Sequence, residues 1–121
     1  MEQRLFELLD VLVKYNTESP PGRNTDPLQD EIEHILKTLN FDIQREHLYE
    51  NDSVIVATLK GEDEDAPKLI LNGHVDVANV DDDSNWQYPP FQLTEKEGWL
   101  YGRGVSDMKG GMASLFYVLE D

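Results

Sequence analysis

Residues 68–77 read Lys-Leu-Ile-Leu-Asn-Gly-His-Val-Asp-Val, an apolar run that ends at a glycine and is followed by a histidine and an aspartate two positions apart. Consecutive apolar residues such as Leu69 to Leu71 are typical of a strand covered on both faces, as in a parallel or mixed sheet between helix layers. Ligand sites of such sheets lie beyond the carboxyl ends of the strands. This stretch therefore predicts an α/β fold with His74 and Asp76 at a candidate site.

His74 and Asp76 would share a face if strand geometry continues to residue 76, because the side chains of a strand alternate with period two. The carboxylate could then accept one imidazole N–H and leave the other ring nitrogen for a metal ion, which is the usual support of a ligating histidine. A histidine in a strand-end turn with an acidic neighbour is the alternative. This single motif leaves both interpretations open.

Helical and strand patterns alternate around this stretch. Apolar spacing and turn residues predict helices over residues 5–13, 26–39 and from 107 onward, and strands over 41–49, 54–59, 91–94 and 99–101. Asp26 is expected to cap the second helix, and Glu97 with Gly98 to turn a hairpin. The fold class we expect is α/β, with helix layers on a mixed, largely parallel β-sheet.

The composition excludes several classes of partner. Ten basic residues against 25 acidic ones give a formal charge of -15, which disfavours nucleic acid and anionic membranes. The absence of cysteine excludes disulfides and thiolate metal sites, so His, Asp and Glu remain as strong metal ligands. No apolar run approaches the ~20 residues of a membrane span. We expect a soluble protein without a signal peptide, located in the cytoplasm.

A second informative stretch, residues 102–111, reads Gly-Arg-Gly-Val-Ser-Asp-Met-Lys-Gly-Gly. Its glycines permit backbone shapes that other residues avoid. Asp107 in this turn is either a ligand held by an unusual backbone or the N-cap of the helix that follows. The residues alone leave both readings open.

Taken as an ordered pair, Gly73–Val77 and Gly102–Gly111 closely resemble the two first motifs of the M20-type metallopeptidase family. This family includes acetylornithine deacetylase, succinyl-diaminopimelate desuccinylase, aminoacylases and carboxypeptidase G-like enzymes. The resemblance implies that His74 ligates one metal ion and that Asp107 bridges two. It also implies a catalytic part for Asp76, as the orienting partner of His74, and a cis peptide bond between Asp107 and Met108. The two divalent ions are expected to be zinc, with cobalt as the alternative.

The reaction implied by the resemblance is hydrolysis of the amide bond of an N-acyl amino acid or a related small amide by a water that bridges two metal ions. The partner is then a small acylated amino acid or a short peptide, and the parent protein is expected to be a homodimer. A dipeptidase or aminopeptidase of the same family is an alternative. A non-catalytic interaction domain that retains the fold is another.

The family's paired glutamates, its second ligand histidine and its lid and dimerisation domain have no counterpart here. Glu120 is the only glutamate after Asp107, and it follows the second motif too closely to be one of that pair. We therefore expect residues 1–121 to be the N-terminal part of an incomplete zinc-exopeptidase-like catalytic domain. Alone, this polypeptide should bind metal weakly and be inactive.

Overall fold

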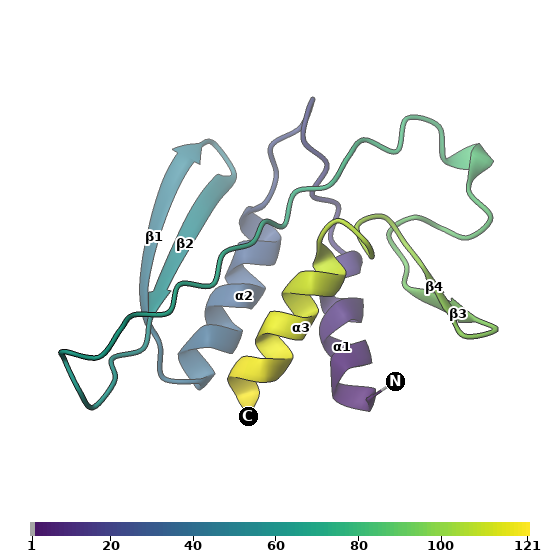
Figure 1. Ribbon diagram of the computed structural model, residues 1–121. Helices are drawn as coiled ribbons and strands as arrows, with labels where there is room; N and C mark the ends of the chain where they lie inside the picture. The colour runs from purple at the N-terminus through teal and green to yellow at the C-terminus, as the bar shows by residue number, and fades with distance from the viewer. Residues whose placement is uncertain (1) are drawn as a thin grey trace.

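Three helices and two antiparallel strand pairs make up the computed structural model, which describes residues 2–121 (Figure 1). The helices are α1 (Gln3–Val13), α2 (Asp26–Thr38) and α3 (Lys109–Glu120), and a short 3-10 turn, η1, covers Asp83–Asn85. The strands are β1 (Asp42–Tyr49), β2 (Asp52–Thr58), β3 (Thr94–Lys96) and β4 (Trp99–Tyr101). The helices lie side by side, with the β1–β2 pair beyond α2 and the β3–β4 pair beyond α1. None of the described helices is both long and apolar enough to cross a bilayer.

The apolar stripes of the three helices meet in one core. The buried members from α1, α2 and α3 are Leu8, Leu9, Leu12, Val13, Leu28, Ile32, Leu36, Ala113 and Phe116. An ion pair at the surface joins the start of α1 to the end of α3, where Arg4 Nε donates to Glu120 Oε2 at 2.8 Å. Burial of this shared face holds the helices together, because apolar area removed from water is the main favourable term in folding.

The start of α2 differs in detail from the sequence prediction. Thr25 occupies the N-cap position and Asp26 is the first helical residue, so the prediction of Asp26 as the cap is wrong. The Asp26 carboxylate instead accepts hydrogen bonds from Ser53 Oγ at 2.6 Å and from Arg45 Nη2 at 3.2 Å. Thr25 Oγ1 donates to Asp52 Oδ1 at 2.6 Å. These polar contacts fasten the first turn of α2 to the β1–β2 pair.

The α/β class is confirmed, but the described strands form two separate antiparallel pairs, β1–β2 and β3–β4. The expected hairpin is present, although its first strand covers Thr94–Lys96 and not the predicted residues 91–94. Glu97 and Gly98 have φ values of 53° and 83°, as a two-residue hairpin turn between right-handed twisted strands requires. Within residues 2–121 the parallel pairing is limited to one isolated bridge between Glu18 and Val77, so the largely parallel sheet does not form there.

The apolar run that begins the first motif is not a buried strand, and this part of the prediction is wrong. Residues 68–72 have no strand assignment, and Leu69 and Ile70 are 83% and 85% exposed. A strand exists only by virtue of hydrogen-bonded neighbours, and among residues 2–121 no strand lies beside this segment. The apolar pattern therefore marks a surface suited to burial, and none of the described elements buries it.

Candidate metal centre

The three residues singled out in the sequence lie together. His74 Nδ1 is 3.2 Å from Asp76 Oδ1 and 3.1 Å from the Asp76 backbone oxygen, while His74 Nε2 is 3.1 Å from Asp107 Oδ1. One ring nitrogen therefore faces Asp76 and the other faces Asp107. This is the arrangement in which a carboxylate orients the imidazole and leaves the opposite nitrogen for a ligand.

The donor pair fits a shared cation. Zinc binds His nitrogen and carboxylate oxygen at about 2.0–2.2 Å, so two such ligands at interbond angles of about 90–110° lie roughly 2.9–3.5 Å apart. The 3.1 Å between His74 Nε2 and Asp107 Oδ1 falls in that range. Among the described residues no cluster of three or more His, Asp, Glu or Cys is arranged to hold a metal ion. The chain therefore brings two candidate ligands together, fewer than a zinc site requires.

The backbone around His74 and Asp107 is shaped by close packing. A Cβ at Gly73 would overlap Met112 Sδ, so a larger residue there would have to displace this methionine side chain of α3. The His74 backbone N–H donates to Met108 Sδ at 3.3 Å. The peptide bond between Asp107 and Met108 is cis, as the family resemblance predicts.

Asp107 is not the cap of α3. Met108 occupies the N-cap position, and no side chain caps this end of the helix. The Asp107 side chain is instead 87% exposed, compared with 45% for His74 and 51% for Asp76. The N-cap interpretation of Asp107 is therefore wrong. Its carboxylate is accessible from solvent.

Lys109, which was not among the candidate residues of the sequence analysis, is completely buried beneath this turn. Its Nζ donates to the backbone oxygen of Tyr15 at 2.9 Å. Burial away from water disfavours the ammonium and lowers the pKa of Lys109 to about 8. A signal was present in the spacing, because Lys109, Ala113 and Phe116 follow the i, i+4, i+7 pattern of one helix face, and all three are buried.

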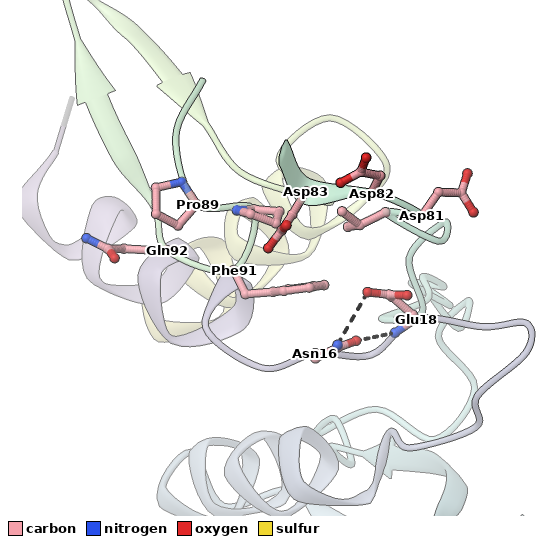
Figure 2. A pocket seen from close by; sticks show the side chains of 10 residues that line it. Asn16, Glu18, Asp81, Asp82, Asp83, Pro89, Phe91 and Gln92 are labelled. Carbon is pink, nitrogen blue, oxygen red and sulfur yellow. Dashed lines mark hydrogen bonds between the residues drawn. The ribbon is translucent and has the colours of Figure 1, made fainter. Parts of the chain in front are cut away.

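A separate open pocket of about 720 Å³ lies away from this centre and contains none of its three residues (Figure 2). The side chains of Glu18, Asp81, Asp82, Asp83 and Phe91 line it. Asp82 accepts a hydrogen bond from the Ser84 backbone N–H at 2.9 Å, and this bond lowers the pKa of its carboxyl group. The acidic stretch is thus an exposed loop with a local turn.

Residues 70–121 match the sequence profile of peptidase family M20/M25/M40. This segment contains both motifs. The resemblance predicted from the two motifs is confirmed.

Individual relatives match nearly the whole chain. An N-formyl-4-amino-5-aminomethyl-2-methylpyrimidine deformylase of Bacillus subtilis is 44% identical over 120 residues, which cover 98% of this chain and 28% of that protein. A probable succinyl-diaminopimelate desuccinylase of Staphylococcus aureus is 40% identical over 124 residues, with the same coverage of 98% and 28%. The chain therefore spans little more than a quarter of the length of these relatives.

A solved structure gives the same fold. Human carnosine dipeptidase 1 aligns with a TM-score of 0.81 over 96% of this chain and 27% of its own, at 23% sequence identity. At this identity the likeness concerns the fold alone. It confirms the expected α/β fold.

Proposed function

We propose that the protein to which this chain belongs hydrolyses the amide bond of a small N-acyl compound with the help of two divalent metal ions. The observation that carries the proposal is the convergence of His74 Nε2 and Asp107 Oδ1 at 3.1 Å, within a segment that matches a peptidase family. Zinc is the metal we propose, and cobalt the alternative. Both ions accept nitrogen and oxygen ligands.

Each residue has a defined task in this proposal. His74 would hold one ion through Nε2, and the Asp107 carboxylate would be a ligand of both ions. Asp76 fixes the ring through Nδ1, since its side-chain and backbone oxygens both lie within 3.2 Å of that nitrogen. Bound divalent ions lower the pKa of a water they share and so supply a nucleophile at neutral pH.

The acyl group is the part of the substrate that the relatives suggest. The names of these two relatives refer to removal of a formyl group and of a succinyl group. We therefore propose a small formyl, acetyl or succinyl amide as substrate, released as a carboxylate and a free amine. A dipeptidase or aminopeptidase activity is the competing proposal within the same family.

The test uses the polypeptide that the complete reading frame encodes, loaded with zinc. Release of free amine is measured from N-formyl, N-acetyl and N-succinyl amines and from a set of dipeptides. Turnover of the acylated amines supports the proposal, whereas turnover of dipeptides alone favours the peptidase. Absence of turnover on every substrate, with metal bound, favours a non-catalytic interaction domain.

A pair of histidine variants provides the control. His74→Ala should reduce turnover by at least about 10³-fold, because a metal ligand is lost. His34→Ala should leave it unchanged, because His34 is exposed on α2 and far along the chain from both motifs. Equal activity of the two variants would remove His74 from the mechanism.

The 121-residue chain alone should show no turnover in the same assay, because it offers two ligands where zinc requires at least three from the protein. Robust amidase activity of the isolated chain would contradict the proposed division of the site.

We further propose a cytoplasmic location and a homodimeric state for the parent protein.

A further inference from the structure

One short segment, Tyr15–Ser19, contacts both halves of the candidate metal centre. On one side it lies along the strand-like residues that follow His74. The Val77 N–H donates to the Thr17 oxygen at 3.1 Å, and the Ser19 N–H donates to the Val77 oxygen at 3.0 Å. The Thr17 hydroxyl adds a third bond, to the Val75 oxygen at 2.6 Å.

On the other side the same segment is bound by α3. Lys109 Nζ donates to the Tyr15 oxygen at 2.9 Å, and this lysine begins the helix two residues after Asp107. The lysine stem packs against Gly104, where an added Cβ would lie 3.1 Å from Lys109 Cδ and 2.6 Å from Val77 Cγ1. The three segments therefore interlock around Gly104.

Both side chains that make these bonds are withdrawn from solvent. Thr17 is 1% exposed and Lys109 is 0% exposed. Within residues 2–121 no carboxylate lies at ion-pair distance from Lys109, so its one hydrogen-bond acceptor is the Tyr15 carbonyl. A buried ammonium is costly to retain where an apolar side chain of similar length would fill the space. Its presence is explained if the bond to Tyr15 serves the site.

We propose that Tyr15–Ser19 is a clamp that sets the separation of His74 and Asp107, with Thr17 and Lys109 as positioning residues. The inference rests on the proposed function, in which these two ligands share a metal centre. His74 and Asp107 are 33 residues apart in the chain. Apart from the contact between their own side chains, the described hydrogen bond between their segments is the weak one from the His74 backbone N–H to the Met108 side-chain sulfur. The clamp supplies the rigid connection that this bond lacks.

The test measures metal binding, without reference to turnover. The polypeptide that the complete reading frame encodes, labelled with ¹⁵N, is titrated with Zn²⁺ while the imidazole nitrogen signals of His74 are followed by NMR. Thr17→Val and Lys109→Met should each raise the apparent Kd for Zn²⁺ about tenfold, the lower end of the effect of losing support behind a ligand. Thr17→Ser keeps the hydroxyl and should restore the wild-type Kd.

A core variant separates positioning from a general loss of stability. Ile32→Val, in the core between the helices, should lower the free energy of unfolding by about 0.5–1.5 kcal/mol and leave the Kd unchanged. Wild-type Kd values in both Thr17→Val and Lys109→Met would overturn the clamp and leave the proposed function intact. Zn²⁺ that leaves the His74 signals of the complete wild-type polypeptide unshifted, at any concentration, would instead overturn the proposed function.

Discussion

Because the Lys109 ammonium is buried, the free energy of unfolding should rise with pH in the alkaline range. Its pKa is about 8 in the folded protein and 10.5 in an exposed chain. Between these values the unfolded state holds a proton that the folded state has released, so stability rises with pH. The 2.5-unit difference, at about 1.4 kcal/mol per unit, corresponds to about 3 kcal/mol gained between pH 8 and pH 10.5.

Lys109→Met isolates this contribution. The methionine removes the titrating group and the burial cost that the ammonium carries at neutral pH, but it leaves the Tyr15 carbonyl without its donor, a loss of about 1–3 kcal/mol. These effects oppose each other. At pH 7.5 we therefore expect the variant to be at least as stable as the wild type.

The assay is urea unfolding followed by tryptophan fluorescence at pH 7.5, 9 and 10.5. Other groups that titrate in this range, including Tyr15, whose pKa is raised by burial and by Glu31, are common to both proteins and cancel in the difference. The stability of wild type minus variant should increase by about 3 kcal/mol across the range. A difference that stays constant to within about 0.5 kcal/mol would refute the reasoning, since Lys109 would then titrate alike in both states.

Three further outcomes follow from the packing. Gly104→Ala should lower the free energy of unfolding by roughly 3 kcal/mol in the same assay, because φ is +91° there and the new Cβ would lie 2.6 Å from Val77 Cγ1. Gly61→Ala, with nothing within 4 Å of its added Cβ, should change it by less than about 0.5 kcal/mol, and an equal loss in both would contradict the packing account. The Ser53 hydroxyl donates to Asp26 and holds the pKa of that carboxyl group below 3.8, so Ser53→Ala should raise this pKa. The variant should then lose less stability as the pH falls through the pKa of Asp26. An unchanged titration of the carboxyl group by NMR would argue against this bond.

Elements determined by nearby residues were predictable from the sequence. The apolar spacing of residues 5–13 and the turn at Glu97 and Gly98 gave α1 and the β3–β4 pair, because helix faces and hairpin turns depend on residues a few positions apart. Between motifs the prediction also succeeded: His74, Asp76 and Asp107 lie together as expected. Their metal-binding roles remain predictions.

Features that depend on distant partners were not predictable. The fully buried residues of α3 are Lys109, Ala113 and Phe116, and which face of this helix is most deeply buried depends on the core that it meets. The clamp was missed as well. Thr17 and Lys109 donate to backbone oxygens of remote segments, and every residue type offers such an oxygen, so no side-chain pattern records the pairing.

The exposed segment at Leu69 and Ile70 should determine whether the protein aggregates at high concentration. Two adjacent apolar side chains more than 80% exposed, on an extended backbone without a neighbouring strand among the described residues, form a template for cross-β stacking between molecules. The net charge of -15 keeps the molecules apart at low ionic strength. Salt at about 0.1 M shortens the reach of that repulsion to about 10 Å. Concentrated stocks should therefore stay clear in dilute buffer and turn turbid as salt is added.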